Sequence, residues 1–214
     1  MEKRKILNGF YNYTVVLTYL GFLLGLLGIV FALRANYRMS MIMLMCAGIC
    51  DMFDGAVAST KERTRPEKNF GIQIDSLSDL VCFGILPAIF VYQMGEGSIA
   101  AMICGGLYAL CALIRLAYFN VCEEERQQSE DGARKYYTGL PVTSAALIWP
   151  LLFILGSYIT AIPMRWALPG LAFVMAVAFV LGFKLRKAHL VGKIIMIVIG
   201  VAELIVTVIG HGMC

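Results

Sequence analysis

Hydrophobic positions along this chain gather into long apolar runs separated by short polar stretches. Seven such runs lie at roughly 12–33, 39–58, 71–95, 98–120, 141–160, 164–183 and 191–210. An apolar helix needs about 20 residues to cross a hydrocarbon core of about 30 Å. Each run therefore predicts a helix in the membrane, and we expect an all-α integral membrane protein with membrane lipids as its surroundings.

The composition supports this interpretation and limits the possible functions. Of the 214 residues, 60% are hydrophobic and 15% are charged, which is too apolar for a soluble domain. Basic residues collect in cytoplasmic loops, and thirteen of the 18 lie on the side of the N-terminus. Arg34, Arg38 and Arg165 lie on the other side, and Arg115 and Lys193 lie in runs. We expect a cytoplasmic N-terminus, and the charge of +4 gives no sign of nucleic-acid binding.

Four aspartates interrupt the second and third runs. Asp51 and Asp54 lie in the last third of the second run, and Asp75 and Asp79 lie one helical turn apart in the third. Both pairs flank the same predicted cytoplasmic loop. Because neighbouring antiparallel helices bring such positions to one depth, we expect the four carboxylates to converge just below the cytoplasmic surface.

Four ionised carboxylates in a membrane need a compensating positive charge. Each costs about 2.5–3.5 kcal/mol even on the mildest insertion scale, and neighbouring carboxylates repel one another. Oxygen ligands suit Mg²⁺, Mn²⁺ or Ca²⁺, and four carboxylates suggest two ions. Carboxylate-bound metals commonly hold phosphates, and Gly55, Ala58 and Gly71 leave the helices thin beside the aspartates. The residues thus predict a phosphate-ester site that opens to the cytoplasm and is accessible to a lipid.

These residues resemble a known family motif. The CDP-alcohol phosphatidyltransferases carry D-x-x-D-G-x-x-A-R-(x)8-G-x-x-x-D-x-x-x-D, and this chain matches it at Asp51, Asp54, Gly55, Ala58, Gly71, Asp75 and Asp79. It departs from the pattern in two places. Ser59 occupies the arginine position, and eleven residues rather than eight separate it from Gly71. Arg63, one turn beyond Ser59, could supply the missing charge to the nucleotide phosphates or could be a solvated loop residue.

The resemblance implies a six-helix core with a cytoplasm-facing site, usually as a homodimer. We expect residues 1–187 to form this membrane domain and residues 188–214 to add a C-terminal hydrophobic helix, which is a peripheral span or a dimer contact. Asn12 and Thr14 resemble the family's entry motif for the CDP-lipid, with a helix N-cap as the alternative. The expected location is the cytoplasmic membrane of a prokaryote.

Three further stretches resemble the serine-using branch of the family: 75–88, 115–120 and 139–146. Arg115 and Asn120 reach the depth of the aspartates, and a buried arginine needs an anion. That anion is either the carboxylate of serine or an acidic residue of this chain, such as Glu123, Glu124 or Glu125.

The activity implied by the resemblance is transfer of the phosphatidyl group from CDP-diacylglycerol to L-serine, giving phosphatidylserine and CMP. Asp51, Asp54, Asp75 and Asp79 would hold Mg²⁺ or Mn²⁺, with Ca²⁺ possible as a bound ion. Asp79 would also be the general base. Asn12, Thr14, Gly55, Ala58, Ser59, Arg63 and Gly71 would bind CDP-diacylglycerol, and Arg115 and Asn120 would bind serine.

Two alternatives stay open at this point. The acceptor could be glycerol 3-phosphate or an inositol phosphate, for which Arg134 and Lys135 would supply positive charge. A cation transporter would also carry membrane carboxylates, but it predicts a site near the bilayer midplane and internal repeats, neither of which the sequence indicates.

Overall fold

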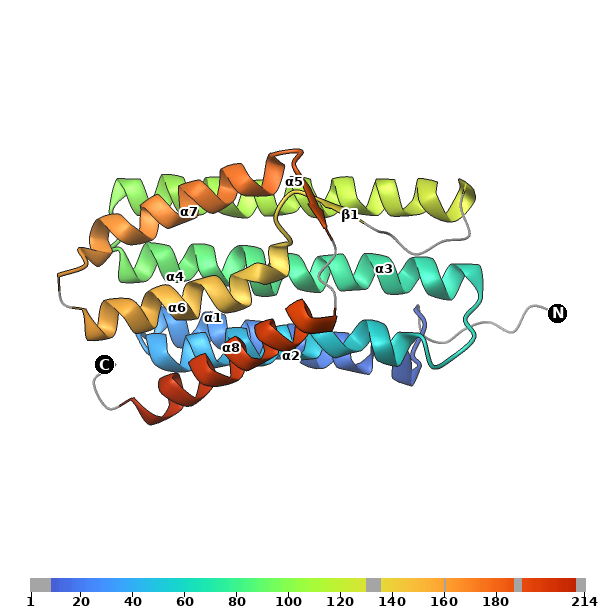
Figure 1. Cartoon of the computed structure of the whole chain (residues 1–214), viewed down its shortest axis with the longest axis horizontal. Helices are drawn as coiled ribbons and strands as arrows, with labels where there is room; N and C mark the ends of the chain where they lie inside the picture. Colours follow the sequence, from blue (N-terminus) through green and yellow to red (C-terminus); the bar gives the residue numbers. More distant parts are fainter. Residues whose placement is uncertain (1–8, 130–135, 160, 187–189, 211–214) are drawn as a thin grey trace.

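The chain is a bundle of helices in the computed structural model, which describes residues 9–129, 136–159, 161–186 and 190–210. Its helices are α1 (Val16–Leu33), α2 (Tyr37–Ala58), α3 (Arg65–Asp79), α4 (Leu86–Met94), α5 (Ile99–Ser129), α6 (Ala145–Tyr158), α7 (Met164–Val180) and α8 (Leu190–Ile209). Short 3-10 turns, η1 (Tyr13–Val15) and η3 (Val142–Ser144), precede α1 and α6, and a wide π-type turn, η2 (Leu80–Ile85), joins α3 to α4. Figure 1 shows the helices lying side by side along the long axis of the molecule. The predicted all-α fold is confirmed.

Every predicted apolar run contains a helix, and the protein is an integral membrane protein. Four helical segments of the described chain are long and apolar enough to cross a membrane: Tyr13–Leu33, Tyr37–Ala58, Arg65–Met94 and Ile99–Glu125. Shorter apolar helices cover Val142–Tyr158, Met164–Val180 and Ile195–Ile209. The described helices thus account for all seven runs.

Two boundaries differ from the prediction because polar residues extend the helices. The third run was expected to begin at Gly71, but α3 begins at Arg65. Thr64 caps it: the Thr64 Oγ1 accepts from the Glu67 N–H at 3.4 Å, and Glu67 Oε2 accepts from the Thr64 N–H at 2.9 Å. The fourth run was expected to end near Asn120, but α5 continues to Ser129. In Figure 1, α3 and α5 extend past α6, α7 and α8 at the end where α2 and α3 connect.

The C-terminal helix α8 runs alongside α2 in the opposite direction. Arg38, at the start of α2, donates from Nε to the carbonyl of Thr207 at 2.7 Å and from its guanidinium to the carbonyl of Val208. These bonds occupy two of the carbonyls that the end of α8 leaves without helical partners. Helix α8 also contacts α6, where Gly200 packs against Leu147. It therefore packs on α2 and α6 between Gly200 and its C-terminal end.

Small residues let α1 approach its neighbours closely. A Cβ added at Gly21 would lie 3.3 Å from Cys50 of α2, and one added at Gly25 would overlap Cys82 of η2. Gly28 packs in the same way against Leu86 of α4. The glycines of the first run are thus packing positions, and they place the beginning of α1 against the halves of α2 and α3 that carry the aspartates.

Two short strands pair with each other and so link two of the loops at the end of the bundle where the α2–α3 loop lies. β1 (Tyr136–Thr138) pairs antiparallel with β2 (Lys184–Arg186), so the α5–α6 connection is fastened to the segment between α7 and α8. Gly139 follows β1 with φ +73°, and its N–H donates to the Phe183 carbonyl at 2.7 Å. A Cβ at this position would lie 2.9 Å from the Leu181 carbonyl, so only glycine fits without strain.

Candidate functional site

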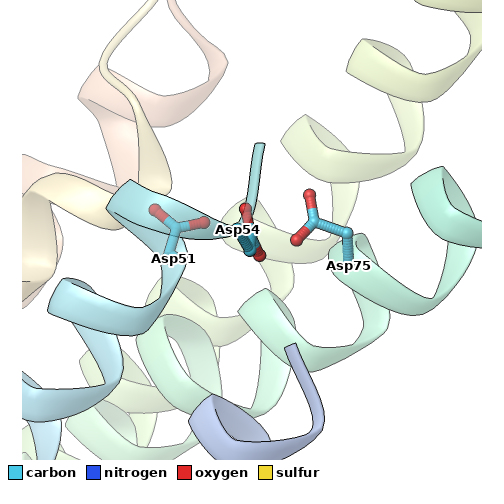
Figure 2. A group of neighbouring side chains, drawn as sticks. All are labelled: Asp51, Asp54 and Asp75. Carbon is cyan, nitrogen blue, oxygen red and sulfur yellow. The ribbon is translucent and has the colours of Figure 1, made fainter. Parts of the chain in front are cut away.

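The aspartates of α2 and α3 converge as predicted. One carboxylate oxygen from each of Asp51, Asp54 and Asp75 lies within 4.8 Å of the other two. Figure 2 shows the Asp75 side chain of α3 pointing across to Asp54 and Asp51 of α2. The spacing explains the convergence, since Asp51 and Asp54 lie three residues apart on one face of α2, opposite the face of α3 that carries Asp75.

Asp79 lies deeper in the same site. Its carboxyl is next to that of Asp51, and the carboxyl of Asp75 is next to that of Asp54. All four aspartates line one small pocket, partly open to solvent, together with Leu17, Thr18, Gly21, Ala47, Ser78, Cys82 and Phe83. The pocket lies between α1, α2 and the α3–η2 segment, one to two turns from the end of α2.

The sequence reasoning missed two hydroxyl residues at this pocket. Thr18 donates from Oγ1 to Asp54 Oδ2 at 3.2 Å, and Ser78 donates to the Thr18 carbonyl at 3.4 Å. Thr18 therefore orients a carboxylate, and Ser78 holds α3 against α1. The signal was present in the sequence: Thr18 lies one turn after Thr14 in an apolar run, and Ser78 lies between Asp75 and Asp79.

The carboxylate geometry fits a divalent cation. Opposite ligand oxygens lie about 4.0–4.2 Å apart around Mg²⁺ and about 4.6–5.2 Å apart around Ca²⁺, twice the usual metal–oxygen distances. Oxygens of Asp51, Asp54 and Asp75 all lie within 4.8 Å of one another, which falls in the Ca²⁺ range, and the shorter Mg²⁺ spacing requires the side chains to move closer by a few tenths of an ångström. The donor set consists of hard oxygen ligands from a half-buried site, as Mg²⁺, Mn²⁺ and Ca²⁺ prefer.

Beside the aspartates, the backbone of α2 is open at one glycine, and an arginine of the α2–α3 loop lies against α3. A Cβ added at Gly55 meets no atom within 4 Å, so the backbone of α2 is accessible there. Arg63 lies against α3, with its Nη1 3.0 Å from the position of a Cβ at Gly71. Ala58 is half-buried, and the Ser59 hydroxyl donates to the Ala56 carbonyl at 2.7 Å, which closes the end of α2. The Arg63 guanidinium thus lies beside Gly71 at the start of α3, whereas Ser59 carries no charge.

Asn12 and Thr14 form the helix cap that was the alternative to a ligand role. Asn12 Oδ1 accepts from the Thr14 N–H at 3.1 Å and also from the Thr14 hydroxyl. Its Nδ2 donates to Glu67 Oε1 at 3.4 Å, and Lys61 Nζ lies 3.8 Å from the same oxygen. Glu67, which the sequence reasoning did not single out, therefore joins the N-terminal turn to the α2–α3 loop.

Arg115 and Asn120 belong to α5, which packs beside α3 and η2. Asn120 Oδ1 accepts from the Ser76 hydroxyl at 2.8 Å, and a Cβ at Gly84 would lie 3.4 Å from Ala112. Because α5 runs opposite to α3, Arg115 lies between these two levels, close to the turn that follows Asp79. Its Nη1 is 3.2 Å from the position of a Cβ at Gly139. Neither Arg115 nor Asn120 lines the aspartate pocket itself. Arg134 and Lys135 lie outside the described residues.

The fold and the site define a class: an integral membrane protein of packed helices with a carboxylate cluster near one end of the spans. Residues 11–209 match the family model described as CDP-alcohol phosphatidyltransferase. The chain belongs to this family, and the match covers all four aspartates and α8.

Individual relatives carry related names. Over 135 residues, the chain is 32% identical to the archaetidylserine synthase of Methanothermobacter thermautotrophicus, covering 63% of this chain and 54% of that protein. Over 104 residues, it is 38% identical to the CDP-diacylglycerol–serine O-phosphatidyltransferase of Saccharomyces cerevisiae, covering 47% and 37%. For the enzyme of the same name from Helicobacter pylori, the identity is 29% over 153 residues, covering 70% and 60%. The chain thus matches about half the length of these relatives.

Proposed function

We propose that this protein transfers the phosphatidyl group of CDP-diacylglycerol to the hydroxyl of L-serine and releases CMP. The observation that carries the proposal is the convergence of the four motif aspartates in one pocket near the end of the spans. Serine as the acceptor is supported by relatives named as serine or archaetidylserine enzymes. A lipid substrate suits the pocket because it lies between membrane helices.

The aspartates would hold divalent cations, and the proposal includes two ions, Mg²⁺ or Mn²⁺, with Ca²⁺ as a possible bound ion. Asp51, Asp54 and Asp75 form the group whose oxygens lie closest together, and Asp79 adds a fourth carboxylate. When bound, the cations supply positive charge for the diphosphate and for the departing CMP. Thr18 keeps Asp54 oriented, and Arg63 with the open backbone at Gly55 offers the nucleotide phosphates a further binding surface.

Acceptor binding is assigned to the α3–α5 side of the site. Arg115 would hold the serine carboxylate with its planar guanidinium, and Asn120 would hold the amine or hydroxyl. Asp79 would accept the proton of the serine hydroxyl as its oxygen attacks the phosphorus atom. The phosphorus–oxygen bond to CMP then breaks, and the proton stays on Asp79 until it exchanges with solvent.

The proposal also includes the orientation in the membrane, the domain bounds and the oligomeric state. The N-terminus and the site face the cytoplasm, as the distribution of basic residues indicates, and the membrane is that of a prokaryotic cell. Residues 1–187 form the catalytic domain, 188–214 an additional helical segment, and Asn12 and Thr14, besides capping the first turn, contribute to CDP-lipid binding. The enzyme acts as a homodimer, as in the family that it belongs to.

The direct test is CMP release by the purified protein. The protein in detergent is incubated with CDP-diacylglycerol, Mg²⁺ or Mn²⁺, and one acceptor at a time: serine, glycerol 3-phosphate, inositol 1-phosphate or none. We expect release that depends on both serine and the divalent ion. Release with glycerol 3-phosphate or inositol 1-phosphate but not with serine would reject the serine assignment and keep the family chemistry.

Arg115→Lys tests the acceptor site. A lysine keeps the charge but loses the bidentate fork. We therefore expect the KM for serine to rise about tenfold to a hundredfold, as the loss of a charged hydrogen bond predicts, with the KM for CDP-diacylglycerol unchanged. Steady-state kinetics with each substrate varied in turn measures both constants.

The matched control is Arg165→Lys. Arg165 is an exposed arginine at the opposite end of the spans, where it lies 3.9 Å from Glu96. This variant should keep both KM values. An Arg115→Lys enzyme with the wild-type KM for serine would remove Arg115 from the acceptor site.

A further inference from the structure

The helix that carries Asp75 and Asp79 changes its winding immediately after Asp79. In η2 the backbone makes wide turns, and the N–H of Leu86 bonds to the Val81 carbonyl five residues back. Such a turn holds about one residue more than an α-turn, and it shifts everything beyond it by about 100° around the helix axis. Asp79 and Leu86, seven residues apart, would lie on one stripe of a regular α-helix. The wide turn therefore sets how the aspartates before it are rotated relative to the residues beyond it, such as Leu86, which packs against Gly28 of α1.

Proline leaves one carbonyl of this turn without its helical partner. The Phe83 carbonyl would bond to the N–H of residue 87 in an α-helix, but Pro87 has none. Tyr108 of α5 takes that place, donating its hydroxyl to the Phe83 carbonyl at 2.6 Å. Trp149 of α6 in turn donates its indole N–H to the Tyr108 oxygen at 3.2 Å. Tyr108 and Trp149 are fully buried, so water does not substitute for either bond.

This chain of hydrogen bonds ends at the wall of the aspartate pocket. Phe83 lines the pocket together with Asp51 and Asp79, and it lies one turn beyond Asp79 on the same continuous helix. A buried carbonyl without a donor is costly, so without Tyr108 the segment around Phe83 would shift until its carbonyl met another donor. Asp75 and Asp79 lie on the same continuous helix, so such a shift would move them relative to Asp51 and Asp54 of α2.

We propose that Tyr108, oriented by Trp149, is a positioning residue that fixes the wide turn and so sets the rotation of Asp75 and Asp79 toward the aspartates of α2. The proposal rests on the metal-binding role given to these carboxylates under the proposed function. It extends the site to two residues on α5 and α6 that touch neither substrate nor cation.

The test is the affinity of the purified protein for Mn²⁺ alone, measured from the free Mn²⁺ signal in electron paramagnetic resonance. Tyr108→Phe removes one oxygen and keeps the ring packing on Trp149 and Phe179. We expect Mn²⁺ affinity to fall about tenfold, within the range seen when outer partners of metal ligands are lost. Trp149→Phe keeps the Tyr108 hydroxyl but removes the indole N–H that donates to it. We expect this variant to lose Mn²⁺ affinity as well, but less than Tyr108→Phe.

The matched control is Phe153→Leu, which changes a buried ring in the same core that packs against Phe90, away from the wide turn. Melting temperatures are measured for all variants, and affinities are compared well below them. A selective loss of affinity in Tyr108→Phe supports the proposal. Unchanged affinity in that variant overturns it, as does an equal loss in Phe153→Leu. If Tyr108→Phe does not fold, Trp149→Phe decides by the same criteria.

Failure of the proposed function is distinguishable from failure of this inference. Wild-type protein that binds Mn²⁺ but releases no CMP with serine rejects the proposed function, while the comparison of variants still decides the role of Tyr108. Wild-type protein that binds no Mn²⁺ contradicts the positioning role together with the metal site.

Discussion

Asparagine in place of Asp51 or Asp75 is expected to abolish CMP release. Both residues contribute an oxygen to the group that lies within 4.8 Å, and an amide is a neutral, weaker ligand for a hard cation. The other three carboxylates of the pocket already belong to the site, so none of them replaces the lost ligand. The measurement is CMP release across a wide range of Mg²⁺ and Mn²⁺ concentrations, together with Mn²⁺ affinity.

Glu96→Gln serves as the control for the change from carboxylate to amide. Glu96 is 73% exposed in its side chain and lies at the opposite end of the spans beside Arg165. This variant should keep both activity and Mn²⁺ affinity. Ordinary activity of Asp51→Asn or Asp75→Asn at ordinary metal concentrations would contradict the metal site.

The core of the site could be predicted because it follows helical periodicity. Asp51 with Asp54, and Asp75 with Asp79, are spaced for one helix face, and a short loop makes α2 and α3 neighbours. The depth of the aspartates followed from their distance to the helix ends. The glycines of α1 were also readable as packing positions, and Gly21 and Gly25 lie against the helices that bear the aspartates.

The parts that escaped prediction depend on contacts between segments far apart in the chain. The wide turn after Asp79 could not be predicted from the hydrophobic pattern. Leu80–Ile85 is apolar throughout, so its sequence does not distinguish a π-turn from an α-turn. Tyr108 and Trp149 look like ordinary core aromatics until the carbonyl that Pro87 leaves unpaired is known. The capping box at Thr64 was a readable signal, and overlooking it placed the beginning of α3 six residues too late.

The position of Asp79 separates its role from those of the other aspartates. It lies next to Asp51 but does not belong to the group of three oxygens that Asp51, Asp54 and Asp75 form. Under the proposed function, the acceptor binds on the α5 side of α3. A carboxylate that lies beside the three-carboxylate group but outside it would then be free to accept the proton of the serine hydroxyl.

Asp79→Asn is accordingly expected to lower turnover by about 10²–10⁴-fold, the usual effect of removing a general base. The KM for CDP-diacylglycerol should change little, because the three-carboxylate group remains. An asparagine has nearly the same shape, so the wide turn beyond it should persist. Asp75→Asn, one turn away on the same helix, is the matched comparison, with Mn²⁺ affinity and CDP-lipid binding measured for both. If Asp79→Asn loses Mn²⁺ affinity and CDP-lipid binding as severely as Asp75→Asn, then Asp79 is chiefly a metal ligand and another group accepts the proton.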